Sequence, residues 1–224
     1  MIKTIDYTCV IMSNLKNLFY EIAASRKGVK PLFEPAHVLK TLLLLYEKEP
    51  IGRNVLSRML GIGVASTRTL IKRLKEYDLV NVDYVGGCIL TERGKRVIER
   101  IMSVVRRIEN STAIIEEDLR LAPYSWLAVL DNSIELVKKF GIVNIRDKLI
   151  GYGAKAALIV FVEEFAYIPP DKELNEKKYS TLRNIRSSLL LKFGDVAIIS
   201  FANGLNVAEK ALLNTLIDVV LDTC

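Results

Sequence analysis

The 224-residue sequence has no glutamine, one histidine and three cysteines. The cysteines Cys9, Cys88 and Cys224 are odd in number and far apart, which excludes a disulfide framework and a zinc knuckle. No second histidine or cysteine stands at metal-ligand spacing from His37, so the sequence predicts no metal site and no cofactor. We expect His37 to hydrogen-bond locally in the first turn of a helix. The absence of glutamine beside plentiful Lys, Arg, Glu and Ile favours a thermophilic source.

Long hydrophobic runs are also missing. The apolar stretches 38–46 and 156–162 are too short to cross a bilayer. No N-terminal segment combines a cationic start, an apolar stretch and a small-residue cleavage site. The hydrophobic fraction of 50% still favours packed structure over disorder. We therefore expect a cytoplasmic protein that does not enter a membrane.

Recognisable catalytic motifs are absent as well. The phosphate-loop pattern GxxxxGK[ST] does not occur, and Gly151-Tyr152-Gly153 follows a predicted helix, whereas a dinucleotide fingerprint follows a strand. No serine or cysteine has a base that the sequence can assign to it. The sequence therefore predicts no catalytic residue and no enzyme.

The charge is divided unevenly along the chain. Residues 1–110 hold 19 Lys and Arg against 11 Asp and Glu, whereas residues 111–224 hold 13 against 15. A basic half joined to a mildly acidic half is typical of a nucleic-acid binder with a second module. Ordinary surface variation is the alternative explanation.

Hydrophobic periodicity and turn residues predict an α+β protein. A winged helix-turn-helix with an N-terminal helix is expected over 1–110, and residues 111–122 are expected to end a long helix that links it to the rest. Residues 123–224 read as a ferredoxin-like βαββαβ domain with helices on one face and a last helix on an edge or second face. Residues 1–11 are expected to be a short extended or frayed lead, with Met12 as a possible start and Ser13 capping a helix to about Ala24.

The helix-turn-helix is the most informative part of the chain. A helix over 53–60 is predicted to bury Val55 and Leu56, and Gly61 and Gly63 bracket the turn. A second helix follows over 64–77, with Leu70, Ile71 and Leu74 facing inward. Wing strands are expected at 79–83 and 88–90, joined at Gly86-Gly87, after which Thr91 caps the next helix.

The polar side of the second predicted helix carries the candidate DNA contacts. Serine and threonine can bond phosphates or base edges, arginine can read guanine through two hydrogen bonds, and lysine suits phosphate. A tyrosine at the wing tip could reach the minor groove or a sugar. The alternative is that these are solvated surface positions. The predicted contacts are Arg53, Ser66, Arg68, Thr69, Lys72, Arg73 and Tyr84.

A heptad-like apolar seam follows, at spacings of 3, 4, 3, 7 and 4 residues. It predicts one long helix that pairs two copies in a homodimer, as reading a palindromic site requires. Packing on the helix 13–24 of the same chain is the alternative. The seam consists of Ile98, Ile101, Val105, Ile108, Ile115 and Leu119.

The segments 50–56, 61–63 and 68–74, followed by Leu90-Thr91-Glu92-Arg93-Gly94, resemble archaeal winged-helix transcriptional regulators. The stretch 33–39, Phe-Glu-Pro-Ala-His-Val-Leu, is similar to the start of one such family. Its members end in a domain of unassigned function, which 153–161 and 194–200 resemble. The resemblance spans about residues 13–222 and implies DNA binding, but it carries over no ligand and no catalytic residue.

The leading hypothesis is therefore a sequence-specific, dimeric regulator of transcription that binds double-stranded DNA. Its C-terminal domain would sense a small-molecule effector or mediate assembly. Two alternatives come from other classes: a winged helix appended to an enzyme, as in archaeal riboflavin kinases, or one that docks a protein partner. A docking face is usually apolar at its centre, whereas this helix exposes cations.

Overall fold

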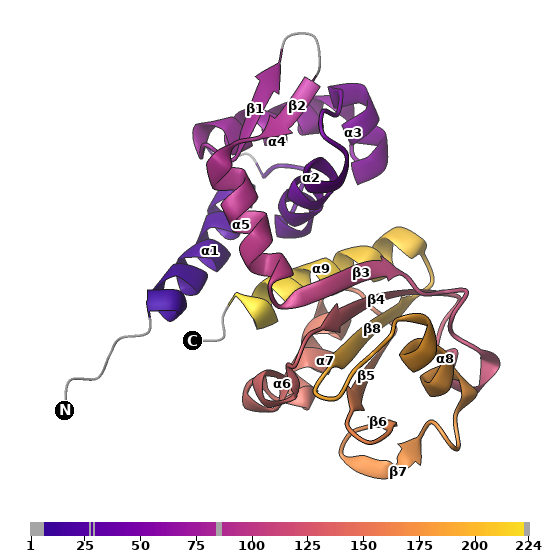
Figure 1. The fold of residues 1–224 in the computed structure, drawn as a ribbon. Helices are drawn as coiled ribbons and strands as arrows, with labels where there is room; N and C mark the ends of the chain where they lie inside the picture. Colours follow the sequence, from indigo (N-terminus) through magenta and orange to yellow (C-terminus); the bar gives the residue numbers. More distant parts are fainter. Residues whose placement is uncertain (1–6, 27, 29, 84–86, 222–224) are drawn as a thin grey trace, which may run out of the picture. The chain divides into compact units, whose positions relative to one another are not determined.

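The computed structural model describes residues 7–26, 28, 30–83 and 87–221, and it combines helices with antiparallel sheets (Figure 1). The chain divides into two compact units, 1–101 with 220–224, and 102–219. Residues 102–110, expected in the N-terminal domain, thus belong to the second unit. None of the helices in the described ranges has the length and apolar character that a membrane crossing requires.

The first unit packs helices around one apolar core. Its helices are α1 (Tyr7–Ala23), α2 (Pro35–Lys48), α3 (Arg53–Leu60), α4 (Val64–Glu76) and α5 (Glu92–Met102). The expected extended lead is wrong from Tyr7 onward, because no glycine or proline interrupts the helical pattern there. The core collects apolar side chains from all of these helices, including Phe19, Ile22, Leu42, Leu56, Leu70, Leu74 and Ile98.

A two-stranded antiparallel sheet, β1 (Val80–Asp83) and β2 (Gly87–Leu90), follows α4. The backbone of Cys88 pairs with Ile51 before α3, with N–O distances of 3.0 and 2.8 Å. The Cys88 side chain is buried, and burial raises the pKa of its thiol. The sheet is therefore tied to the start of α3.

Two glycines set the geometry of this unit. Gly61 ends α3 at a φ of 70°, in the left-handed region that side chains disfavour. Gly94 allows α5 to approach the preceding chain, since a Cβ there would lie 2.1 Å from the carbonyl oxygen of Leu79. Thr91 caps α5 as predicted, because its hydroxyl oxygen accepts the Gly94 N–H at 3.0 Å.

The predicted long helix over 91–119 is wrong. The helix stops at Met102, and Val105–Asn110 form strand β3, which pairs with β4 (Tyr124–Leu130). The β-branched Val104, Val105 and Ile108 suit a strand, where they pack on a pleated surface. The seam is thereby divided between several elements. Ile98 and Ile101 lie in α5, and Val105 and Ile108 lie in β3. Leu119 lies in a 3-10 turn (Glu117–Leu119), and Ile115 lies between β3 and that turn.

The second unit is built on a six-stranded antiparallel sheet in the order β3-β4-β8-β5-β6-β7. Its other strands are β5 (Ala156–Val162), β6 (Ala166–Ile168), β7 (Asp171–Asn175) and β8 (Val196–Ala202). Its helices are α6 (Ile134–Phe140), α7 (Ile142–Gly151), α8 (Ser180–Ser188) and α9 (Leu205–Val220). The elements match the predicted βαββαβ order plus a helix, except that the expected loop 169–178 contains β7.

The strand order differs from the predicted ferredoxin-like sheet. That sheet would place the first and third strands of the βαββαβ order, here β4 and β6, side by side at its centre. Instead β8 lies between β4 and β5. The reason is length and polarity: β8 has seven residues and is buried throughout, whereas β6 has three.

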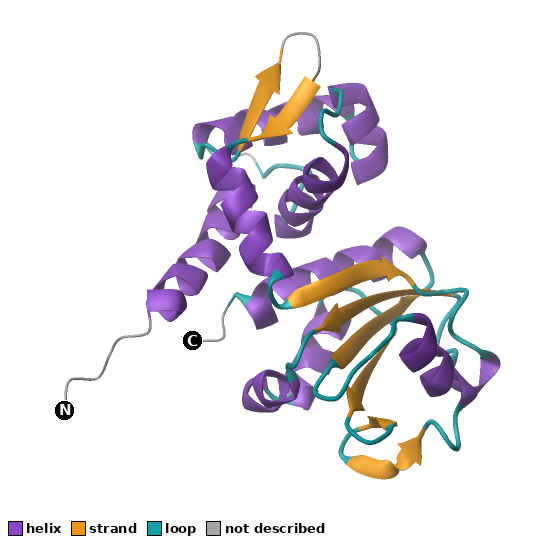
Figure 2. Ribbon diagram, in the orientation of Figure 1, coloured by secondary structure: helices purple, strands orange, loops and turns teal. Residues whose placement is uncertain are grey.

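Both faces of this sheet are covered, which corrects the expectation of helices on one face (Figure 2). The register aligns Leu127, Ile199 and Leu158 in a row that belongs to the core beneath α8. The alternate row, Ala128, Ile198 and Ile159, is equally buried and faces the side of α7 and α9. Helices on both faces explain why β8 is apolar at every position except Ser200.

Buried carboxylates hold the second unit together through ion pairs. Asp195 accepts Arg106 at 2.9 Å, and also the backbone N–H groups of Asn132 and Lys192. Asp218 of α9 accepts Lys148 of α7 at 2.5 Å and the hydroxyl of Tyr152 at 3.0 Å. These contacts join elements that are distant in the sequence.

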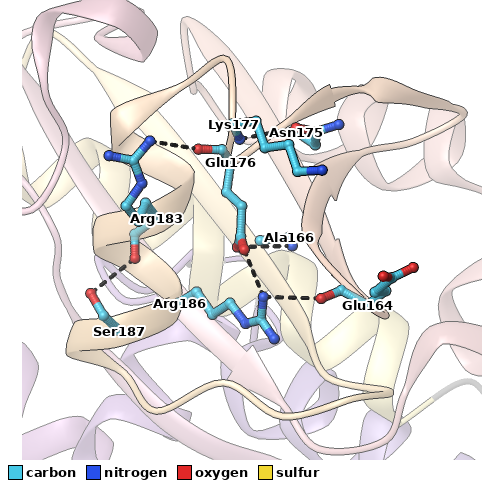
Figure 3. A network of polar contacts seen from close by, with 8 residues as sticks. All are labelled: Glu164, Ala166, Asn175, Glu176, Lys177, Arg183, Arg186 and Ser187. Carbon is cyan, nitrogen blue, oxygen red and sulfur yellow. Dashed lines mark hydrogen bonds and ion pairs between the residues drawn. The ribbon is translucent and has the colours of Figure 1, made fainter.

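A third network joins the β6–β7 hairpin to α8 (Figure 3). The Glu176 carboxylate accepts Arg186 at 2.7 Å and the backbone N–H of Ala166 at 3.1 Å. Arg186 also donates to the carbonyl oxygen of Glu164, and Arg183 donates to that of Glu176. One carboxylate thus fixes a strand, a loop and a helix at once.

Candidate nucleic-acid interface

The outer face of α4 is a row of polar and cationic side chains. Arg68, Lys72 and Lys75 are exposed, and they follow one another at helical spacing. None of the three side chains has an ion pair or hydrogen bond within the described part of the chain. The inner face is apolar as predicted, since Leu70, Ile71 and Leu74 are buried. The helix is therefore anchored on one side and offers positive charge on the other.

A shallow hollow of about 300 Å³ lies where α3 and α4 begin, and Arg53, Asn54 and Arg68 line it. Val55 and Val64 complete it, and their side chains are 42% and 47% exposed. The prediction that Val55 is buried is thus wrong, because Leu56 takes the core position of α3. The hollow combines cations, an amide and two methyl-bearing surfaces.

A second hollow, of about 550 Å³, continues along α4 towards the sheet. Arg53 and Arg68 line it too, together with Lys72, Lys75 and Val82 of β1. Glu76 is the one carboxylate on its lining, and Arg26 holds it at 2.5 Å. The Arg26 hydrogen bond lowers the pKa of Glu76, so this carboxylate is charged at neutral pH.

The opposite flank of α4 faces the segment that follows α1. Ser66 and Thr69 line a hollow of about 350 Å³ there, together with Arg26 and Lys30. The Thr69 hydroxyl donates to the Ala65 carbonyl at 3.1 Å, which leaves its oxygen able to accept. Cations thus lie on both flanks of the outer face of α4.

Arg73 does not belong to this surface, which corrects its prediction as a DNA contact. It is 5% exposed and donates to the carbonyl oxygens of Ile22 and Ala24, each at 2.6 Å. Its guanidinium lies 5.2 Å from the ring centre of Phe33. Burial lowers its pKa. Arg73 therefore satisfies backbone carbonyl oxygens at the end of α1 and is a structural residue.

The remaining candidates are accounted for as follows. Tyr84 lies outside the described residues. His37 acts locally as expected, since its Nδ1 accepts the Glu34 N–H at 3.0 Å. No group of three or more metal-ligating side chains occurs among the residues that the structure describes.

Sequence reasoning missed several residues of this surface. Lys75 could have been found from its spacing to Arg68 and Lys72. Arg26 and Lys30 could not, because only the tertiary structure brings their segment beside α4. Exposed Val64 gave no signal, since an apolar residue at a helix start usually predicts burial.

Comparison with known proteins finds two matches, one within each unit of the chain. Residues 36–96 match the PH0730-like N-terminal domain, and residues 121–219 match a domain of unknown function, DUF4443. The expected C-terminal domain of unassigned function is thereby confirmed. The hypothetical protein PH0730 from Pyrococcus horikoshii OT3 is a similar solved structure, with 25% identity and a TM-score of 0.63.

That similarity covers 82% of this chain and 91% of the other. A search of curated proteins found no match. None of these descriptions names an activity, so function is argued from the surface around α4.

Proposed function

We propose that residues 35–102 form a winged helix-turn-helix that binds double-stranded DNA, and that the protein regulates transcription. The observation that carries the proposal is the outer face of α4, where Arg68, Lys72 and Lys75 stand without partners in the described residues. Between Val64 and Lys75 the helix has no carboxylate. A cationic helix surface on an apolar base suits the major groove.

The surrounding elements support a winged helix. α3 and α4 are joined by the short turn Gly61–Gly63, β1 and β2 form a hairpin-like pair, and α5 follows. In such modules the second helix of the turn enters the major groove, and phosphate contacts come from residues beside it. Arg53 on one flank and Lys30 on the other would contact the two phosphate backbones.

Base contacts are expected near the start of α4. Arg68 can donate two hydrogen bonds to guanine, whereas Val64 and Val55 can contact the methyl group of a neighbouring thymine. Lys72, Lys75 and Arg53 would contact phosphates and fix register without reading sequence. Specificity would therefore reside in Arg68 and the two valines.

The second unit would sense a small molecule or mediate assembly, and we propose that two copies act on DNA together. The predicted seam no longer supports the dimer, because it is divided between α5, β3 and the 3-10 turn. A dimer would therefore need contacts other than one continuous helical seam.

Duplex binding can be measured by fluorescence anisotropy with the full chain and a random pool of 30-base-pair duplexes, followed by selection of preferred sites. Affinity should fall as salt rises, because each phosphate contact releases counterions. Arg68→Ala should cost about tenfold or more at selected sites and reduce discrimination, since a bidentate contact is worth about 1–3 kcal/mol. Lys72→Ala should weaken all sites alike and lower the salt slope by about one.

Arg146→Ala is the matched control, because Arg146 is an exposed arginine on α7 of the second unit. It should leave duplex affinity unchanged. Failure of the folded wild-type chain to bind any duplex at low salt would overturn the proposal.

A further inference from the structure

A hollow of about 530 Å³ lies between α1 and α5 in the first unit. Three arginines of α5, Arg93, Arg96 and Arg100, line it at spacings of three and four residues, which places them on one face of the helix. The hollow shares no lining residue with the three hollows around α4. It is therefore a separate feature of the same unit.

The positive charge of two of these arginines, Arg93 and Arg96, is not balanced among the described residues. Arg93 and Arg96 are exposed and have no ion pair or hydrogen bond among the described residues. Glu21 is the carboxylate on the lining, and it accepts the hydroxyl of Tyr77 at 3.4 Å. Like charges three and four positions apart on a helix repel one another. An anion bound between the guanidinium groups would remove this repulsion.

The floor of the hollow has a different chemistry. Leu15, Leu18 and Val97 are buried and apolar, and the half-buried ring of Tyr77 stands beside them. Guanidinium groups bind phosphate and carboxylate oxygens through paired hydrogen bonds. An apolar floor and an aromatic ring favour a planar or apolar group on the same ligand.

We propose that this hollow binds a small polyanion that also carries a planar apolar group, of the class of nucleoside di- and triphosphates. The phosphates lie between Arg93, Arg96 and Arg100, and the base lies on the apolar floor beside Tyr77. A volume of about 530 Å³ falls within the range of about 300–1,000 Å³ typical of small-molecule sites. The site would add a nucleotide-binding function to the unit that we propose binds DNA.

Isothermal titration calorimetry of the full chain tests the proposal with three probes: ATP, tripolyphosphate and adenosine. ATP should bind at least tenfold more tightly than tripolyphosphate, because tripolyphosphate cannot use the apolar floor. Adenosine should bind at least tenfold more weakly than ATP, because it lacks the anionic groups. Equal affinity for ATP and tripolyphosphate, or no ATP binding at all, would overturn the proposal.

The double variant Arg93→Gln, Arg96→Gln should lose at least tenfold in ATP affinity. Its matched control is Arg58→Gln, Arg146→Gln, which removes the same charge from exposed positions outside the hollow. An equal loss in the control would mean that ATP responds only to net charge, and would overturn the site.

Duplex binding distinguishes this site from the α4 surface. The Arg93, Arg96 double variant should keep duplex affinity within about twofold while it loses ATP. A parallel loss of both would overturn the proposal by assigning these arginines to a nucleic-acid surface. Failure of duplex binding by the wild-type chain would leave the ATP titration interpretable by itself.

Discussion

The two units differ in how many of their cations are paired with buried carboxylates. In the second unit Arg106, Lys148 and Arg186 each hold a carboxylate that is mostly buried. In the first unit the side chains of five exposed cations have no ion pair or hydrogen bond among the described residues: Arg68, Lys72 and Lys75 on α4, and Arg93 and Arg96 in the α1–α5 hollow. Charges that are satisfied internally contribute to the fold, whereas cations that gather without partners around a hollow are available to a ligand. We therefore expect the paired cations of the second unit to stabilise the fold, and the unpaired cations of the first unit to bind ligands.

The most severe test of this comparison is Asp218→Ala. It removes the carboxylate that Lys148 and the Tyr152 hydroxyl contact between α7 and α9. We expect the free energy of unfolding to fall by about 3 kcal/mol, near the lower end for a broken buried pair, because the Lys148 side chain is 34% exposed. Urea denaturation followed by circular dichroism measures the change.

Asp218→Asn is the control, since the amide oxygen can still accept the Tyr152 hydroxyl. It should cost clearly less than Asp218→Ala. An equal cost in both variants would mean that the ion pair, rather than the hydrogen bond, carries the whole effect.

A moderate effect is expected for Glu176→Ala, which removes the acceptor shared by Arg186 and the Ala166 N–H. We expect a loss of about 2 kcal/mol, typical of hydrogen bonds to a charged group. Hydrogen exchange should increase at the β6–β7 hairpin, which the network of Figure 3 fixes to α8. Glu173→Ala, at an exposed residue of β7, should change stability by less than about 0.5 kcal/mol. A similar loss in both variants would contradict the role of the network.

The smallest effect, and of opposite sign, is expected for Arg93→Gln with Arg96→Gln. Removing two like charges from one face of α5 should stabilise the free protein by about 0.2–0.5 kcal/mol. Thermal unfolding without added anions measures the change, and excess ATP should reverse the order of the two proteins. Destabilisation of the free variant would show that these arginines contribute to the fold and would remove the contrast between the units.

Much of the first unit could be predicted from the sequence because its signals are local. The bounds of α3 and the start of α4 follow from glycines beside an apolar periodicity, and Thr91 marks the start of α5. The DNA-contact prediction for Arg73 was wrong because an arginine on a helix looks the same whether it faces water or the carbonyl oxygens of another helix. Only the end of α1, some 50 residues earlier, decides this.

The second unit illustrates the other limit of local patterns. Most of its strands and helices were predicted, yet their order in the sheet was not, because pairing depends on contacts between distant segments. The apolar spacing from Ile98 to Leu119 fits a heptad, but Val105 and Ile108 are also strand formers. The segment forms a strand because β4 offers backbone partners to every residue of β3 except Arg106, where the register shifts.

The buried thiol of Cys88 can report how often the first unit opens. While β2 remains paired with β1 and with Ile51, the sulfur is out of reach of reagents and, with its raised pKa, is protonated at neutral pH. In a chain whose Cys9 and Cys224 are replaced by serine, alkylation can proceed only as often as this unit opens. The rate of labelling would therefore measure how often the packed core of the first unit opens. The measurement leaves every residue on the exposed face of α4 unchanged.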